Sequence, residues 1–318
     1  MSAGPSEFDL IDRIKARVPA RADVRLGIGD DAAVVQPSRG MQLVATTDQL
    51  VEGRHFDDRA TPADLGHLSL AANLSDLAAM GATPRWLLLA MTLPEADPDW
   101  LDGFLDGFLA LAAAHDCGLV GGNLTRGPLN IAITALGEVP GGQFARRSGA
   151  RPGDRIVVTG WPGDAAAALA LDVDRDHPLC DRLLRPGPRI AAGKKLAGLA
   201  RGMIDISDGL LADLGHTLGP LGADLDLEAL PASEDLLKAV PDAARRAQLQ
   251  LCGGGDYELL AVVPPHANWP DHRDDVPLSV IGTVTDAGPV RCLDADGVDH
   301  APDVRGWDHF AEPGEKGS

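Results

Sequence analysis

Aspartate residues stand beside glycine or threonine at the ends of strand-like stretches, instead of being spread along helix faces. Asp30 and Asp31 follow a Gly-Ile-Gly turn, and Thr46, Thr47 and Asp48 close a run of strand-forming residues. A single aspartate in such a place is more typical of a turn or a helix cap. The repeated context instead favours Mg²⁺, which prefers oxygen ligands and keeps water, leaving room for phosphate groups.

Two further acidic groups continue this pattern. Asp76 lies in the segment Asn-Leu-Ser-Asp of an expected helix, and Asp205 and Asp208 flank the end of a strand that leads into another helix. Carboxylates that converge on one place repel each other unless metal and phosphate neutralise them. The set therefore favours metal binding, with room left for the phosphate groups of a substrate.

Two glycine-rich segments are expected to form turns. The segment 121–127 could present backbone N–H groups to a phosphate, and three consecutive glycines at 253–255 imply a backbone that something approaches closely. The chain has no Walker A sequence and no GxGxxG after a strand, so neither a P-loop nor a Rossmann site is supported. No nucleophilic triad is recognisable, and a lone histidine such as His55 is more often structural than catalytic.

Hydrophobic periodicity, together with glycine and proline residues that end helices and strands, predicts the elements that carry these residues. Helices are expected at 7–18, 61–80, 98–117, 164–171, 191–200 and 210–218, and strands at 42–46, 87–93, 131–139, 155–159, 203–206, 223–227, 257–263 and 280–284. A polar segment rich in glycine and proline at 146–154 separates the halves. We expect a two-domain α/β chain with domains at 1–148 and 149–318.

Composition excludes several functional classes. The 318 residues carry a net charge of −19, which argues against nucleic-acid binding because phosphate backbones require a basic surface. No run of 18 apolar residues could span a membrane, and the first residues lack the pattern of a signal peptide. Four widely spaced cysteines suit reduced thiols. We therefore expect a cytoplasmic enzyme without a nucleic-acid or membrane partner.

Eight motifs in collinear order resemble the thiamine-monophosphate kinase family, within the superfamily of aminoimidazole ribonucleotide synthetases. They are GIGDDAAVV (27–35), TTDQLVEGRHF (46–56), NLSDLAAMGATP (73–84), GGNLTRG (121–127), RSGARPGD (147–154), DISDGLLADLGH (205–216), GGGDYELL (253–260) and GWDHF (306–310). The resemblance implies an N-terminal ferredoxin-like, dimerising domain and a C-terminal α/β domain that completes the active-site cleft. It also implies a homodimer that binds ATP, thiamine monophosphate and several Mg²⁺ ions, and forms thiamine diphosphate.

The resemblance also assigns roles to individual residues. The positions that match magnesium ligands are Asp30, Asp31, Thr46, Thr47, Asp48, Asp76, Asn123, Asp205 and Asp208. The positions that match ATP contacts are Gly122, Asn123, Arg147 and Ser207. The positions that match contacts to thiamine phosphate are His55, Tyr257 and Trp307. Asp48, Asp208 and Arg147 are expected to act in catalysis.

Two positions depart from the family pattern. The family commonly has aspartate where this chain has Asn123, and glutamate where it has Gly255. An amide still offers an oxygen to Mg²⁺ but carries no charge, so we expect altered binding of that metal. The alternatives are another ATP-using enzyme of the superfamily, a sensor that binds ATP and thiamine phosphates without turnover, and a metal-dependent phosphohydrolase.

Overall fold

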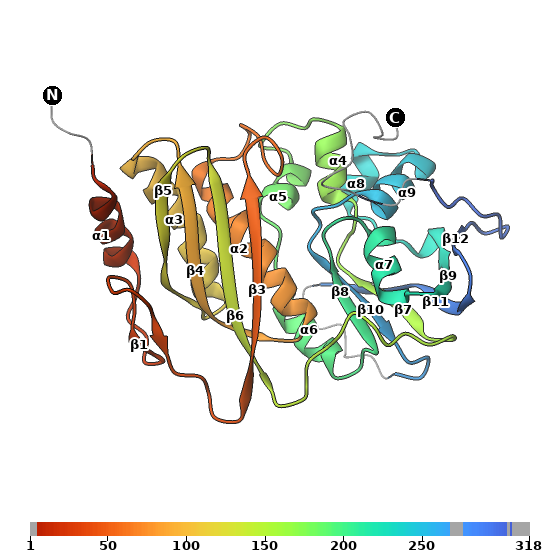
Figure 1. Cartoon of the computed structure of the whole chain (residues 1–318). Helices are drawn as coiled ribbons and strands as arrows, with labels where there is room; N and C mark the ends of the chain where they lie inside the picture. The colour runs from red at the N-terminus through yellow and green to blue at the C-terminus, as the bar shows by residue number, and fades with distance from the viewer. Residues whose placement is uncertain (1–4, 268–275, 304–305, 307–318) are drawn as a thin grey trace. The chain divides into compact units, whose positions relative to one another are not determined.

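The chain folds into two compact units with their own sheets (Figure 1). The computed structural model describes residues 5–267, 276–303 and 306. The first unit comprises Met1–Leu77 and Ala82–Phe144, and the second comprises Ala78–Gly81 and Ala145–Ser318. The expected domains 1–148 and 149–318 differ from these units at residues 78–81 and 145–148.

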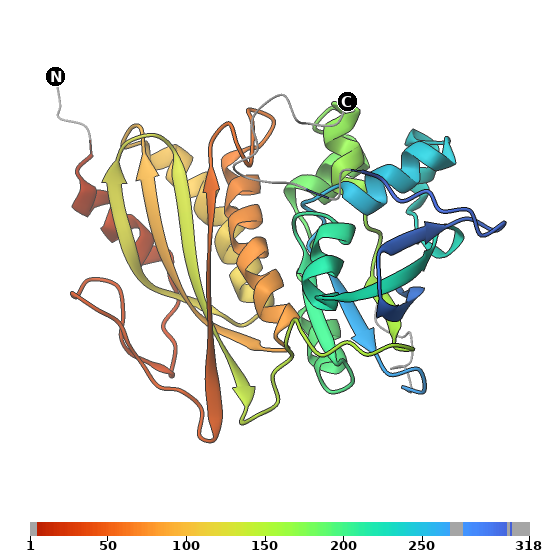
Figure 2. The same ribbon diagram turned by 45° about the vertical axis from the view of Figure 1, so that its right-hand side comes forward.

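The first unit is built on a four-stranded sheet in the order β3-β6-β4-β5, with a two-stranded sheet β1-β2 beside it. Its elements are α1 (Glu7–Arg17), β1 (Val24–Leu26), β2 (Val34–Val35), β3 (Met41–Val51), α2 (Pro62–Ala79), β4 (Thr83–Leu93), α3 (Pro98–Ala114), β5 (Gly118–Arg126) and β6 (Asn130–Pro140). The helices α2 and α3 cover one face of the larger sheet, as both views show (Figures 1 and 2).

The two covering helices contact each other through glycine. A Cβ atom on Gly66 of α2 would lie 2.0 Å from the carbonyl oxygen of Phe104, and one on Gly107 of α3 would lie 1.9 Å from that of Ala63. The backbones therefore touch directly. Phe104 and Phe108 are fully buried beneath this contact, and each buried side chain of this size stabilises the fold by about 2 kcal/mol.

The second unit contains a six-stranded sheet in the order β12-β9-β11-β7-β10-β8. Its elements are β7 (Arg155–Thr159), α4 (Asp164–Ala170), α5 (Pro178–Leu184), α6 (Ile190–Ala197), β8 (Gly202–Ile206), α7 (Leu210–Leu218), β9 (Leu221–Asp226), the 3₁₀ turn η1 (Leu227–Ala229), α8 (Glu234–Ala239), α9 (Ala243–Cys252), β10 (Glu258–Val263), β11 (Leu278–Ala287) and β12 (Val290–Leu293). Every residue of β8 and β10 is buried, which places these strands in the core.

The sequence prediction for segment 121–127 was wrong: Gly118–Arg126 is strand β5, not a glycine turn. It pairs in parallel with β4, from Trp86 opposite Gly118 to Leu93 opposite Arg126. A Cβ atom on Gly122 would lie 1.8 Å from the carbonyl oxygen of Leu89. Glycine is therefore needed here for close strand approach, not for a change of direction.

Within the described residues, no helix combines the length and the apolar character that crossing a bilayer requires.

Candidate active site

Strand β3 presents one group of predicted site residues. Thr46 donates a hydrogen bond of 2.5 Å from its hydroxyl to Oδ2 of Asp76 on α2, so the two motifs meet on the face of the sheet that the helices cover. Asp48 is two residues further along the strand and therefore shares this face. Its Oδ1 accepts a hydrogen bond of 2.6 Å from the backbone N–H of Gln49.

Thr47 lies on the opposite face of the same strand. Its hydroxyl donates to the carbonyl oxygen of Ile133 and accepts from the hydroxyl of Thr134 on β6. Thr46 is thus in contact with Asp76, and Asp48 shares that face of the sheet, while the side chain of Thr47 is directed away from it.

The register of the sheet also separates Asn123 from Asp48. Leu50, Ile131, Met91 and Leu124 form one row across the four strands, and all four are buried beneath the helices. Because neighbouring residues of a strand point to opposite faces, Asn123 lies on the other face. It is exposed there.

The Gly-Ile-Gly segment carries two exposed aspartates, Asp30 and Asp31, close to a lysine of α1. A Cβ atom on Gly29 would lie 2.6 Å from Nζ of Lys15. The ring of His55, in the loop after β3, accepts a hydrogen bond of 3.1 Å at Nδ1 from the backbone N–H of Val51. One ring nitrogen of His55, a residue predicted to contact thiamine phosphate, therefore helps to fix the loop in which it lies.

In the second unit, Asp205, Ser207 and Asp208 lie at the end of β8. Asp205 is buried, Ser207 is exposed and Asp208 is half-buried. The loop that follows is held by Asp213 of α7, whose Oδ2 accepts hydrogen bonds from the backbone N–H groups of residues 207, 208 and 209. Burial raises the pKa of Asp213 to about 6, and the nearby charge of Asp208 adds to the shift.

The three glycines at 253–255 pack directly against this loop. The carbonyl oxygen of Ser207 accepts a hydrogen bond of 2.9 Å from the N–H of Gly255, and a Cβ atom on Gly254 would lie 2.4 Å from the same oxygen. The close approach expected from the sequence is confirmed, and the neighbour is the β8–α7 loop.

Tyr257 follows these glycines with a backbone φ of 52°. That conformation is rare for an aromatic residue and costs about 1 kcal/mol or more. Its N–H donates to the carbonyl oxygen of Ile206. Arg147 has an exposed side chain, and the preceding carbonyl, that of Arg146, accepts from Met203 at the start of β8. Trp307 lies outside the described residues.

A polar cluster around the buried carboxylate of Glu258, the first residue of β10, was not predicted from the sequence. The carboxylate of Glu258 pairs with the guanidinium of Arg189 and accepts from the hydroxyl of Thr159. Asp256 accepts from the N–H groups of Gly163 and Ala165, and burial raises its pKa well above the ordinary value. The motif GGGDYELL contains both acids, but their partners are distant in the chain.

The donor set of the first unit suits Mg²⁺. In the part of the chain that the structure describes, no three His, Cys, Asp or Glu side chains form a ready-made metal group. Mg²⁺ usually binds one or two carboxylates and fills its other positions with water and substrate phosphates. The carboxylates of Asp48 and Asp76, with the hydroxyl of Thr46, are oxygen ligands of that kind.

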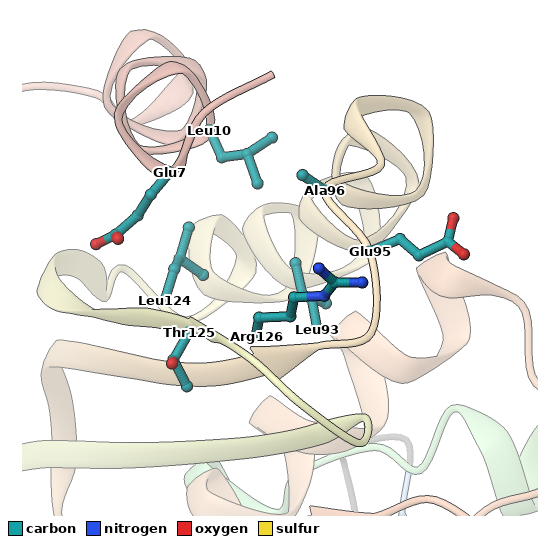
Figure 3. A pocket seen from close by; sticks show the side chains of 8 residues that line it. All are labelled: Glu7, Leu10, Leu93, Glu95, Ala96, Leu124, Thr125 and Arg126. Carbon is teal, nitrogen blue, oxygen red and sulfur yellow. The ribbon is translucent and has the colours of Figure 1, made fainter. Parts of the chain in front are cut away.

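A separate cavity of about 170 Å³ lies in the first unit between α1, the end of β4 and β5 (Figure 3). Leu10, Leu93 and Leu124 supply apolar lining, and Arg126 lines it as well. None of the predicted site residues lines it. This cavity is therefore distinct from the predicted site.

Comparison with known proteins places the chain among its relatives. The family model described as AIR synthase related protein, N-terminal domain, matches residues 29–139. A thiamine-monophosphate kinase of Salmonella typhimurium is 44% identical over 96% of this chain and 99% of its own length. The chain belongs to the thiamine-monophosphate kinase family.

Solved structures of the family agree in fold. The crystal structure of thiamine-monophosphate kinase from Stenotrophomonas maltophilia has a TM-score of 0.81 and 44% identity, covering 90% of this chain and 96% of that one. The structure of AaThiL complexed with AMPPCP and TMP has a TM-score of 0.76 and 32% identity, covering 98% of this chain and 100% of that one. The two-domain aminoimidazole ribonucleotide synthetase-like fold is therefore confirmed.

Proposed function

We propose that this chain transfers the γ-phosphoryl group of ATP to thiamine monophosphate, forming thiamine diphosphate and ADP. The observation that carries the proposal is 44% identity to a thiamine-monophosphate kinase over nearly the whole length of both chains. A relative of the same fold binds AMPPCP, an ATP analogue, together with TMP. The presence of both ligands in one relative supports a two-substrate kinase.

The chemistry needs positioning and charge neutralisation more than a strong base. A phosphate monoester is mostly dianionic near neutral pH, because its second pKa is about 6. An oxygen of thiamine monophosphate attacks the γ-phosphorus in line, the new P–O bond forms, and the bond to the β-phosphate oxygen breaks. ADP leaves with the electron pair of the broken bond. The absence of a nucleophilic triad from the sequence is consistent with this reaction.

The predicted residues divide between the two units. In the first unit Asp48, with Asp76 and Thr46, would hold Mg²⁺, and in the second Asp205 and Asp208 would do so. Bound Mg²⁺ would neutralise charge on the phosphate oxygens. The other assigned metal positions are Asp30 and Asp31 and, on the opposite face of the first sheet from Asp48, Thr47 and Asn123.

The remaining residues would bind the two substrates. Arg147 would add positive charge beside the transferred phosphoryl group, while Gly122 and Ser207 contact ATP. The rings of Tyr257 and Trp307 would face the cationic thiazolium, since aromatic faces attract cations. His55 would contact the thiamine phosphate.

We also propose that the protein is a homodimer that associates through the face of the first sheet opposite α2 and α3. Exposed residues of β3 lie on that face, among them Leu43, Ala45 and Thr47. Leu43 is 52% exposed although it is large and apolar. A second copy of the sheet would cover this surface.

The test of the kinase is ADP release from Mg-ATP with and without thiamine monophosphate, with the product identified by chromatography. Release that depends on thiamine monophosphate, with an equal amount of thiamine diphosphate, is the expected result. It would also show that Asn123 is tolerated. ADP release that is independent of thiamine monophosphate would instead support a phosphohydrolase.

Binding of both ligands by a folded protein without turnover would support the sensor alternative. The variant Asn123→Asp would then show whether the missing charge is the cause. Recovered turnover would indicate that it is.

A further inference from the structure

The loop between β8 and α7 is organised around a single carboxylate oxygen. Oδ2 of Asp213 accepts hydrogen bonds from the N–H groups of Ser207 at 3.1 Å, Asp208 at 3.1 Å and Gly209 at 3.2 Å. Consecutive N–H groups that converge in this way form a concave anion-binding site. Here the anion belongs to the chain itself, and it is only 2% exposed.

The same loop is fixed from its other side. The carbonyl oxygen of Ser207 accepts from the N–H of Gly255, while the missing side chain of Gly254 lets the two backbones touch. The N–H groups of residues 207–209 therefore point toward Asp213. The side chains of Ser207 and Asp208 are left exposed and half-buried, respectively.

We propose that Asp213 is a positioning residue of the phosphoryl transfer: it fixes the loop that presents Ser207 to ATP and Asp208 to Mg²⁺. This inference rests on the proposed kinase function. Hydrogen bonds to a carboxylate are about twice as strong as those between neutral groups. Three of them hold the loop in one shape before any substrate binds, so less ordering is needed on binding.

Two substitutions separate this role from a contribution of charge alone. Asp213→Asn keeps an acceptor oxygen but removes the charge, and Asp213→Glu keeps the charge but moves it by one methylene group. Asp164→Asn is the matched control, because Asp164 is also a buried aspartate of the second unit and bonds to the hydroxyl of Ser233. Amide hydrogen exchange and steady-state kinetics are measured for all four proteins.

In the wild-type protein we expect the amides of residues 207–209 to exchange slowly. Both Asp213 variants should accelerate exchange at these amides, and Asp164→Asn should not. Turnover should fall about 10- to 100-fold, as for other residues that orient a ligand, while the KM for thiamine monophosphate stays within about 3-fold. A loss caused by general destabilisation would instead accelerate exchange throughout the unit.

Fast exchange at residues 207–209 in the wild-type protein would overturn the proposal, even if neither variant folds. Unchanged turnover in a folded variant with faster exchange would overturn it too. If the wild-type protein forms no thiamine diphosphate, the kinase proposal fails separately. Calorimetric binding of Mg-AMPPCP then decides: weaker binding by Asp213→Asn supports the positioning role, and equal binding contradicts it.

Discussion

Asp48 is tied to its own strand by few contacts. Its carboxylate accepts from the N–H of the next residue, so replacing it by asparagine should leave the sheet intact. We expect Asp48→Asn to lower turnover at least about 100-fold, because even outer-shell changes at metal sites cost 10- to 100-fold. Circular dichroism and the ADP-release assay measure the fold and the rate.

The matched control is Asp106→Asn, which removes an exposed carboxylate of α3 that pairs with Arg17. It should keep full turnover. A folded Asp48→Asn enzyme with normal activity would contradict the metal assignment.

The raised pKa of Asp164 predicts that the stability of the second unit depends on pH. Burial raises its pKa from the ordinary 3.8 to about 6, so the folded state holds the proton more tightly than the unfolded state. Stability from this group is full below pH 3.8 and is lost as pH rises through 6. The loss amounts to about 3 kcal/mol relative to a variant that cannot ionise.

The measurement is the difference in unfolding free energy between wild type and Asp164→Asn from pH 4 to pH 7. The hydroxyl of Ser233 can still donate to the asparagine oxygen. We expect the unfolding free energy of Asp164→Asn to increase relative to that of the wild type as pH rises. A constant difference would show that the carboxyl titrates normally.

At the scale of elements, the contact between α2 and α3 has no space for side chains. Gly107→Ala would place a methyl group 1.9 Å from the carbonyl oxygen of Ala63. We expect the unfolding free energy to fall by about 1–3 kcal/mol, as in other overpacked sites. Denaturant unfolding provides the measurement.

Gly215→Ala in α7 provides the control, because nothing lies within 4 Å of the added atom. It should stabilise the protein by about 0.5–1 kcal/mol, since alanine favours helices. Equal effects of the two substitutions would contradict the packing argument.

Elements with local signals were predictable from the sequence. A helix is expected from residue 7, and α1 begins there, where Ser6 caps it and forms a capping box with Asp9. Helix α7 was expected at 210–218 and occurs there. The strand conformation of segment 121–127 was not predictable. In a sequence, glycines that allow two strands to approach closely cannot be distinguished from glycines that form a turn.

The candidate site was predictable as a set of residue types but not as an arrangement. The opposite faces of Asp48 and Asn123 follow from the sheet register, which pairs residues far apart in the chain. Likewise, Asp213 stands in a motif that the sequence analysis singled out. Its three N–H partners could not be predicted, because they depend on how the loop before α7 folds back onto the first turn of that helix.

At the scale of the whole molecule, the proposed dimer predicts a change in mass. Leu43→Glu would place a charge in the apolar part of the interface, where an unpaired charge is costly. We expect analytical ultracentrifugation to show a shift from dimer to monomer. Leu237→Glu on α8 should leave the mass unchanged, although Leu237 is similarly exposed, at 46%. A wild-type monomer would contradict the dimer.

The last residues of α2 belong to the second unit, and this has a consequence for synthesis on the ribosome. A Cβ atom on Gly193 of α6 would lie 2.1 Å from the carbonyl oxygen of Ala78, so that end of α2 packs against a segment translated much later. Domains usually fold in order as they emerge. Here the end of α2 lacks its packing partner until α6 has left the exit tunnel.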